Sequence, residues 1–248
     1  MPFSEWEINQ LQSALDVLAQ FKGLPQFEWV KELLPKLRQG MSARQDARDI
    51  IGFDNNPYLK GLDYLEELYQ AICYKKVLCI SYQSFDEETP KDYWVHPYYL
   101  KSFNNRWFLF GYHPDTEHYN WTLALDRILS IRETGEAYRE NDRIDWDEYF
   151  EDIVGVTKIA GSSVEEVVLH FLGKTGRYVE TKPIHGSQKS KWLDAETLEV
   201  QLQLILNNEL EGLLLSYAER VKVVRPQHLA DTIRDRLLSA AARYGSDE

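Results

Sequence analysis

The sequence predicts an α+β protein with a helical N-terminal region, a small five-stranded β-barrel and a C-terminal domain that mixes strands and helices. Apolar residues recur at helical spacing before residue 75, and five short aromatic-rich runs follow between residues 77 and 133. From residue 163 onward, runs typical of strands alternate with runs typical of helices. We therefore predict a helical linker region over 1–74, the barrel over 75–138, an acidic linker over 139–162 and the C-terminal domain over 163–248.

The N-terminal region contains three predicted helices. Ser4 and Glu7 have the spacing of a capping box, and apolar residues follow at helical intervals, which predicts a helix over about 5–21. Two further helices are predicted over about 27–38 and 61–74. This pattern is typical of a connecting region more than of a catalytic unit.

The middle of the chain contains five predicted strands. They lie at 77–82, 93–100, 106–113, 118–125 and 128–133. Two of them are joined by the polar turn Asn104-Asn105, which predicts a hairpin with polar groups at its tip. Five strands in so short a stretch leave too little chain for a large sandwich, so we expect a small, strongly bent barrel.

The C-terminal domain has an informative order of elements. We predict a strand, a short helix, a hairpin around Asp194-Ala195, a helix, a strand and a final helix, at 164–171, 173–181, 190–193 with 198–206, 209–219, 221–225 and 226–244. This order is β-α-β-β-α-β with one additional helix, and it predicts a ferredoxin-like arrangement.

Composition and charge limit the possible partners. The 248 residues have a formal net charge of −12, and such a charge argues against binding of long nucleic acid over the whole surface. Any anion site must therefore be small and local. No apolar run is long enough to span a bilayer and no secretion signal is visible, so we expect no membrane contact and a cytoplasmic location.

Catalytic and metal-binding motifs are not found. The six histidines are scattered, and no cluster of cysteines and histidines has the spacing of a metal site. The sequence contains no Gly-x-Ser-x-Gly elbow, no Walker loop and no Gly-rich dinucleotide turn. We expect no metal, no cofactor and no enzymatic activity.

One group of polar and aromatic residues around the predicted hairpin could bind a ligand. Cations, an imidazole and flat rings together can hold a phosphate and stack a base. The candidate residues are Tyr82, His96, Lys101, Arg106, Trp107 and Arg127.

Each candidate also has a structural interpretation. The tyrosine and the tryptophan alternate like core residues, and the lysine and Arg106 could serve only to keep a turn soluble. Asp126 beside Arg127 could form a simple surface ion pair. The histidine, which precedes Pro97, could cap a strand.

A second polar patch lies between residues 182 and 192. Its lysines, hydroxyl, amide and imidazole also suit an anion, although an exposed hairpin edge explains the same residues. The members of this patch are Lys182, His185, Ser187, Gln188, Lys189 and Lys191.

Several motifs, taken in order, resemble a known family. Ile80-Ser81-Tyr82, Val95-His96-Pro97, Arg106-Trp107-Phe108-Leu109 and Leu125-Asp126-Arg127-Ile128 resemble the WYL domain of bacterial transcriptional regulators. Residues 164–248 resemble the WCX extension that accompanies this domain, through His185-Gly186-Ser187-Gln188 and the run from Val221 to Pro226.

The resemblance implies an Sm/SH3-like barrel that senses a ligand, either a nucleotide or a short single-stranded nucleic acid. In such regulators, operator DNA is bound by a winged helix-turn-helix that precedes the linker. No basic recognition helix lies ahead of Ser4, so we expect this chain to be the sensor part of a regulator. We also expect a homodimer. The alternative is a ligand-free dimerisation or assembly module.

Two positions depart from the family pattern. Tyr93 and Ala124 stand where many WYL domains have arginine. Lys101, His96 and Arg106 could compensate for these missing cations, but the departure favours a less charged ligand.

Overall fold

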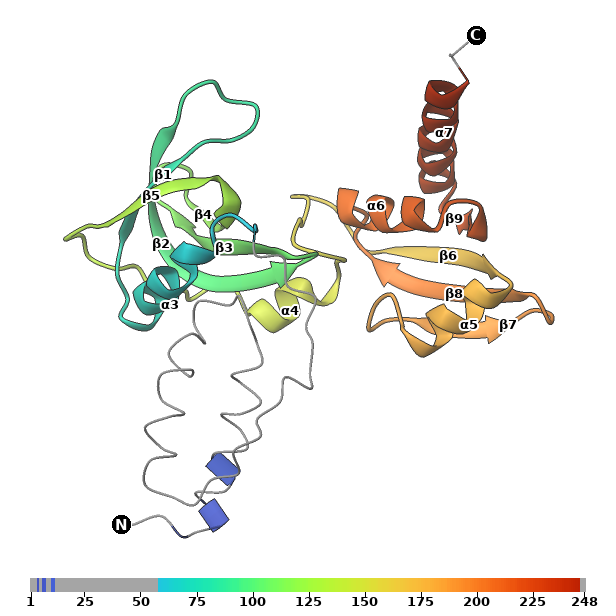
Figure 1. Ribbon diagram of the computed structural model, residues 1–248, viewed down its shortest axis with the longest axis horizontal. Helices are drawn as coiled ribbons and strands as arrows, with labels where there is room; N and C mark the ends of the chain where they lie inside the picture. The colour runs from blue at the N-terminus through green and yellow to red at the C-terminus, as the bar shows by residue number, and fades with distance from the viewer. Residues whose placement is uncertain (1–3, 5, 8–9, 12–57, 246–248) are drawn as a thin grey trace. The chain divides into compact units, whose positions relative to one another are not determined.

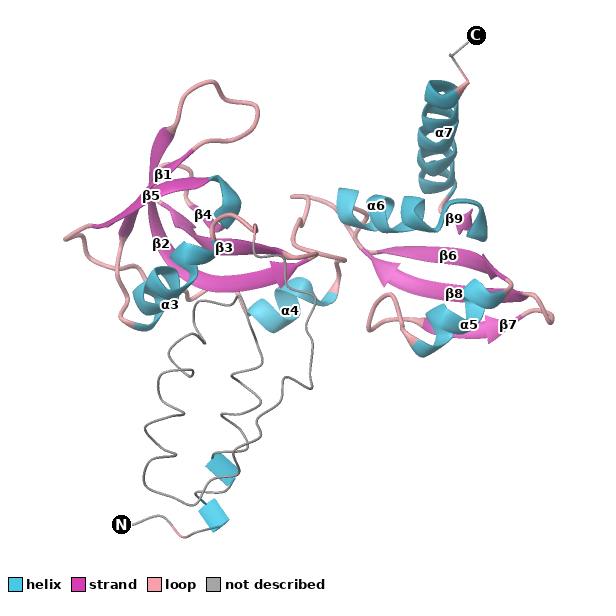
Figure 2. Cartoon of the chain, viewed as in Figure 1, coloured by secondary structure: helices cyan, strands magenta, loops and turns pink. Residues whose placement is uncertain are grey.

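The computed structural model describes residue 4, residues 6–7, residues 10–11 and residues 58–245 (Figure 1). It is a mixed α and β structure with two antiparallel sheets, one of five strands and one of four (Figure 2). The chain divides into two compact units, residues 1–143 and residues 144–248. The predicted mixture of strands and helices is confirmed at this level.

The described part of the N-terminal region agrees with the sequence. The predicted capping box is present, because the Glu7 amide donates to Ser4 Oγ at 3.3 Å and Ser4 N donates to Glu7 Oε2 at 2.8 Å. The predicted helices over about 5–21 and 27–38 otherwise lie outside the described residues. The third predicted helix is η2 (Leu62–Tyr64) followed by α3 (Leu65–Cys73).

The first unit contains all five predicted strands. The strand order is β4-β3-β2-β1-β5, with antiparallel neighbours throughout. The bounds are β1 (Leu78–Tyr82), β2 (Lys91–Phe103), β3 (Arg106–His113), β4 (His118–Ala124) and β5 (Ile128–Glu133), with the turn η3 (Leu125–Arg127) before β5.

β2 is longer than predicted at both ends. Asn104 and Asn105 have φ values of 48° and 58°, the left-handed conformation that a two-residue hairpin turn needs, so pairing with β3 continues to the tip. The strand also passes through Pro97, which has no amide to donate. The register with β3 shifts between Pro97 and Tyr99, and such a bulge accommodates a proline within a strand.

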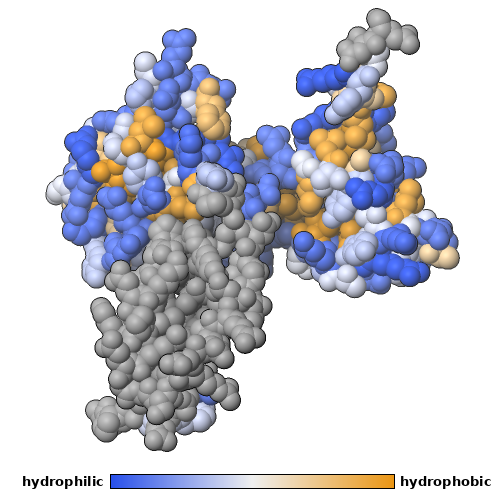
Figure 3. Space-filling view, viewed as in Figure 1, coloured by the Kyte–Doolittle hydropathy of each residue, from blue (hydrophilic) through white to orange (hydrophobic). Residues whose placement is uncertain are grey.

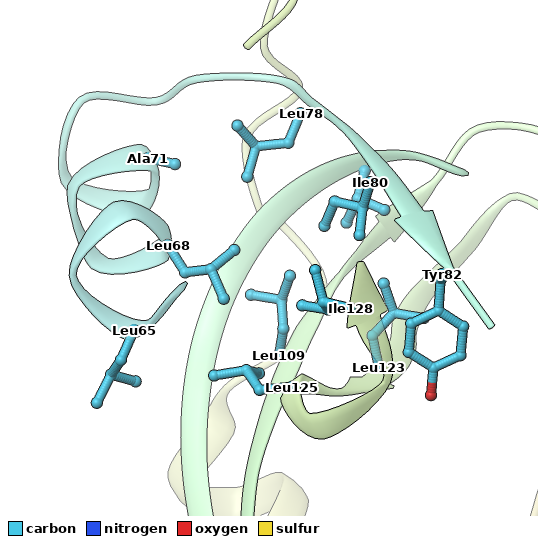
Figure 4. Packing of buried hydrophobic residues seen from close by; sticks show 11 residues of the cluster. Leu65, Leu68, Ala71, Leu78, Ile80, Tyr82, Leu109, Leu123, Leu125 and Ile128 are labelled. Carbon is cyan, nitrogen blue, oxygen red and sulfur yellow. The ribbon is translucent and has the colours of Figure 1, made fainter. Parts of the chain in front are cut away.

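The core of the first unit lies between α3 and the sheet (Figure 4). Alternate residues of β1 face this core, and the cluster comprises Leu65, Leu68, Ala71, Leu78, Ile80, Tyr82, Val95, Leu109, Leu123, Leu125 and Ile128. Burial of each large apolar side chain contributes about 1.5–3 kcal/mol. Gly61, just before η2, allows the backbone to pack closely against η3, because a Cβ at this position would lie 2.3 Å from the Leu125 carbonyl carbon.

The predicted acidic linker over 139–162 is divided between the two units. Residues 139–143 belong to the first unit, whereas α4 (Trp146–Glu151) belongs to the second and is capped by Asp145, whose carboxylate accepts from two amides. The apolar residues that follow, Ile153, Val154 and Val156, are buried. Much of this stretch is therefore packed structure.

The second unit has the predicted order of elements, β-α-β-β-α-β and one further helix. Its strand order is β7-β8-β6-β9, with antiparallel neighbours. The bounds are β6 (Glu165–Leu172), α5 (Lys174–Thr181), β7 (Lys189–Trp192), β8 (Thr197–Leu204), α6 (Asn208–Tyr217), β9 (Val221–Arg225) and α7 (Gln227–Tyr244).

Helix and sheet bury a common core in the second unit. Alternate residues of β8 are buried, as the period of a half-buried strand requires. The side chain of Asn207 caps α6: its Oδ1 accepts from the Leu210 amide at 2.9 Å, and its Nδ2 donates to the carbonyls of Val154 and Thr157 at 2.8 Å each.

The surface of both units is largely polar on the face shown in Figure 3, with smaller apolar areas between the charged residues. None of the helices in the described ranges is long and apolar enough to cross a membrane.

Candidate ligand-binding site

The ends of β1 and β5 bring Tyr82 and Arg127 together. Tyr82 pairs with Ile128, the residue after Arg127, and the amide of Gln83 donates to the Arg127 carbonyl at 3.1 Å. The Tyr82 hydroxyl accepts from the Ala124 amide at 3.4 Å. Burial raises the pKa of Tyr82, and the Arg127 guanidinium opposes this shift. A neutral phenol therefore lies beside a cation.

Arg127 combines a contact to an aromatic ring with an unpaired buried donor. Its guanidinium carbon lies 4.3 Å from the centre of the Phe85 ring, and its Nε is buried with no hydrogen-bond partner. Within the described ranges, no carboxylate lies at ion-pair distance from this guanidinium. An unpaired buried donor costs about 1–3 kcal/mol, which a ligand atom that accepts from Nε would remove.

Phe85 was not predicted as a site residue. It lies in the loop between β1 and β2, and 76% of its surface is exposed. A single aromatic residue in an acidic loop has no periodicity to mark it, and its contact with residue 127 depends on the pairing of β1 with β5. The exposed ring could serve as a stacking platform beside the cation.

Asp126 pairs with Arg106 and not with its neighbour Arg127. Asp126 Oδ2 accepts from Arg106 Nη2 at 2.5 Å, and the side chains are 23% and 38% exposed. The predicted surface pair of Asp126 with Arg127 is thus replaced by a contact between η3 and the start of β3. The other oxygen, Asp126 Oδ1, is buried without a partner, so this turn contains an unpaired acceptor as well as an unpaired donor.

Lys101 and Trp107 lie on opposite faces of the β2–β3 hairpin. Lys101 is opposite Phe108, whereas Trp107 is opposite Ser102. Trp107 is partly buried and packs against the core of the first unit, which agrees with its structural interpretation. Lys101 is partly buried too, and burial lowers the pKa of its ammonium group.

His96 is not brought to Arg127. It follows Val95, which pairs with Leu78 at the opposite end of β1 from Tyr82. The imidazole is 5% exposed, and its Nδ1 accepts from the Arg139 amide at 2.9 Å. The expectation that His96 lines the same pocket as Arg127 is therefore not met by the strand pairing.

The two positions that depart from the family pattern are an aromatic residue and a small apolar residue. The Tyr93 ring lies 6.2 Å from that of Tyr82, 5.7 Å from that of Trp121 and 5.5 Å from that of His113. Ala124 is 5% exposed. Tyr82 thus has an aromatic neighbour in Tyr93, and neither of the two positions adds a cation.

The second predicted patch is largely occupied by its own loop. His185 Nδ1 lies 3.0 Å from Ser187 Oγ, and that hydroxyl also accepts from the Gln203 amide at 3.0 Å. Gln188 accepts from the Ile184 amide at 2.9 Å and donates to the Val179 carbonyl at 3.1 Å. These bonds fix the connection between α5 and β7. They account for these three side chains without a ligand.

The lysines of this patch lie at the end of α5 and along the edge of the sheet. Lys182 follows α5, and Lys189 and Lys191 lie on the edge strand β7, opposite Gln201 and Glu199. Exposed lysines on an edge strand hinder pairing with another chain, as the edge interpretation of the sequence expected.

The first unit also has a hollow lined by acidic residues. A hollow of about 550 Å³ beside α3 is lined by Asp63, Glu66, Glu67 and Glu133 among others, and this charge disfavours an anion. Across the residues that the structure describes, no group of three or more His, Cys, Asp or Glu side chains could hold a metal ion.

The fold and the site define a protein of two α and β units whose first unit has a candidate anion site. A family model for the WYL domain matches residues 63–133, and one for the WCX domain matches residues 163–241. The chain therefore belongs to the WYL-domain family and contains a WYL domain followed by a WCX domain, which confirms the resemblance found in the sequence.

Two solved structures are similar to the chain. One is the proteasome accessory factor B/C (PafBC) of Arthrobacter aurescens, with 16% identity, 96% of this chain and 36% of that chain covered, and a TM-score of 0.31. The other is a CRISPR Cas-related protein, with 9% identity, 74% of this chain and 52% of that chain covered, and a TM-score of 0.46. This chain thus spans about a third and about half of their lengths. No curated protein matches it.

Proposed function

We propose that the chain is the ligand-sensing module of a bacterial transcriptional regulator. Its WYL domain binds a nucleotide or a short single-stranded nucleic acid where Tyr82, Phe85 and Arg127 meet. The environment of Arg127 is the main support: a guanidinium over an exposed ring, with a buried Nε that has no partner.

The chemistry of the site suits such a ligand. The guanidinium can donate to phosphate oxygens, at about 1.5–3 kcal/mol for each charge-assisted bond. The Phe85 ring can stack on a base, at about 1–3 kcal/mol. Asp126 Oδ1 can accept from a base N–H or a sugar hydroxyl. After the costs of association, these terms support affinity in the micromolar range, which corresponds to about 8 kcal/mol.

The ligand should have a low charge. Tyr93 and Ala124 give an aromatic and apolar surrounding at two positions where the family often has cations, and the whole chain has a net charge of −12. One guanidinium neutralises a single phosphate well. A nucleoside monophosphate or a short strand fits better than a polyphosphate or a long duplex.

Several further properties belong to this proposal. The five-stranded sheet is an Sm-like barrel and the four-stranded sheet, with its order β7-β8-β6-β9, is ferredoxin-like. The protein acts in the cytoplasm as a homodimer and catalyses no reaction. Ligand binding biases a winged helix-turn-helix in the complete regulator, and that domain binds the operator DNA.

An assembly module without a ligand is the second candidate. It is favoured by α7, which is exposed from residue 234 to its end and presents Leu238 at 62% and Tyr244 at 90% exposure. Exposed apolar side chains on a projecting helix suit contact with another chain.

One experiment separates the two candidates. The chain is titrated into a fluorescent, 5′-phosphorylated short oligonucleotide and into adenosine monophosphate, and its mass is followed by light scattering. Saturable binding at micromolar concentration supports the sensing module. A stable dimer that is indifferent to both ligands supports the assembly module and contradicts the proposed sensing role.

A further inference from the structure

The segment that leaves the WYL domain is fastened to the face of its sheet. The Tyr98 hydroxyl donates to the Arg139 carbonyl at 2.8 Å, and the Tyr138 hydroxyl donates to the Pro97 carbonyl at 2.6 Å. These bonds join residues 41 positions apart in the sequence. Burial raises the pKa of Tyr138 to about 12, so its hydroxyl remains a donor at neutral pH.

His96 is at the centre of this attachment. Its Nδ1 accepts from the Arg139 amide at 2.9 Å, which requires an unprotonated Nδ1. The ring packs between Tyr112 and Tyr138, with centroid distances of 5.4 Å and 5.7 Å. The backbone of the segment is thus bound by a buried side chain of β2.

Two arginines of the segment lie over tyrosine rings of β3 and β4. The Arg139 guanidinium carbon is 4.6 Å from the centre of the Tyr112 ring and 5.0 Å from that of Tyr119. Arg139 Nη1 also donates to the Tyr112 hydroxyl at 2.9 Å, and the Arg143 guanidinium carbon lies 4.4 Å from the Tyr119 ring. These contacts extend the attachment to the last residue of the first unit.

We propose that residues 138–143, which we name the strap, are a releasable fastening held by His96 and these tyrosines, and that release lengthens the connection between the two units. Thr134 remains anchored, because its amide donates to the Val77 carbonyl at 2.8 Å. The connection after release gains residues 135–143, which span up to about 30 Å when extended. The strap therefore sets the length of free chain that joins the two units.

Protonation of His96 is the trigger that the geometry indicates. A protonated Nδ1 cannot accept from the Arg139 amide, and the new charge lies near the Arg139 guanidinium. The charged groups that act on His96 are Arg139, which disfavours protonation, and Glu136, which favours it. Burial is the largest influence and lowers the pKa of His96, so the strap is fastened at neutral pH and released in acid.

His113 provides a matched control for this inference. It is also buried in the same sheet, at 3% exposure, and its Nδ1 also accepts from a backbone amide, that of Asp115 at 3.2 Å. Replacing either histidine with phenylalanine keeps a ring and removes an acceptor. Of the two substitutions, only His96→Phe removes a hydrogen bond to the strap.

The test uses the full chain and no ligand, so it is independent of the proposed function. Hydrogen exchange measures how readily the bond from the Arg139 amide opens. Spin labels at Glu88→Cys and Glu219→Cys, in a Cys73→Ser background, measure the distance between one label on each unit. Both label positions are exposed. His96→Phe should accelerate exchange of the Arg139 amide about tenfold and broaden the distance distribution towards longer values, as loss of one hydrogen bond implies.

Several outcomes decide the proposal. In the unsubstituted chain, lowering the pH to about 5 should reproduce the effect of His96→Phe. His113→Phe should leave the Arg139 amide and the distances unchanged. If His96→Phe does not fold, Tyr98→Phe tests the same strap through its other bond. Unchanged exchange in the His96 and Tyr98 variants, or equal effects in the His113 variant, would overturn the proposal.

Discussion

Replacing Arg127 with alanine should remove ligand binding and leave the folded WYL domain intact. The side chain lies beside the exposed Phe85 ring and the Tyr82 hydroxyl, and its Nε has no hydrogen-bond partner among the residues that the structure describes. Few contacts of the folded state therefore depend on it. The proposed phosphate, in contrast, depends on it directly.

The expected loss of binding free energy and the expected change in unfolding free energy differ enough to be measured separately. Loss of two charge-assisted bonds to a phosphate costs about 3–6 kcal/mol, which is more than a 100-fold increase in Kd. For the fold, loss of a cation–π contact at an exposed site costs about 0.5–1 kcal/mol. Removing the unpaired Nε relieves a desolvation cost of about 1–3 kcal/mol, which offsets this loss of stability. The net change in unfolding free energy is small, and Tm should move by only a few degrees, at about 2–4 °C per kcal/mol.

Binding is measured by fluorescence anisotropy with the labelled oligonucleotide, and stability by thermal unfolding of the same samples. Arg132→Ala is the control, because Arg132 lies on β5 of the same domain and its side chain is 69% exposed. Among the described residues, its guanidinium donates to Asp92 at 3.5 Å and to Cys79 at 3.3 Å. This variant should bind normally. Equal loss of stability and binding in Arg127→Ala, or normal binding by that variant, would refute the reasoning.

Three further changes test the fold around the sites. Gly111→Ala should destabilise the WYL domain by about 1–3 kcal/mol in urea unfolding, because the new Cβ would lie 2.4 Å from the His96 carbonyl; an unchanged midpoint would contradict this packing. Asn207→Ala should destabilise the WCX domain by about 2–4 kcal/mol, because a helix cap and two bonds to carbonyls are lost, and Asn207→Asp should also destabilise it, because a buried carboxylate oxygen would face those carbonyls. The lowered pKa of His96 means that the unfolded chain binds its proton first as the pH falls, so the WYL domain should lose stability below about pH 6.5. His96→Phe should flatten that part of the pH profile, and a profile identical to that of the unsubstituted chain would contradict the assignment.

Much of the fold could be predicted because local patterns agree with the tertiary structure. Alternating apolar residues in β8 mark a strand with one buried face, and the left-handed Asn104-Asn105 pair marks the hairpin turn. The bulge at Pro97 was not predicted, because it depends on the register with β3. The burial of Ile153 and Val156 within an acidic stretch was missed for the same reason, since only their neighbours in space explain it.

The candidate site was predicted in part. Tyr82 and Arg127 are brought together by the pairing of β1 and β5, and the motifs that contain them are short enough to recognise. The ion pair of Arg106 with Asp126 joins residues 20 positions apart, and the placement of His96 beside the strap depends on contacts 43 positions apart. No local pattern encodes such distances, so the sequence grouped His96 with Arg127 and did not reveal Phe85.

The Arg127 Nε–H signal in a two-dimensional NMR spectrum tests the proposed site most directly. It is recorded while adenosine monophosphate or a 5′-phosphorylated dinucleotide is added to the ¹⁵N-labelled chain. We predict a saturable shift of this signal, together with shifts of the Phe85 ring. Saturable binding that leaves the Arg127 signal unmoved, or no binding of either ligand, would contradict a phosphate site at Arg127.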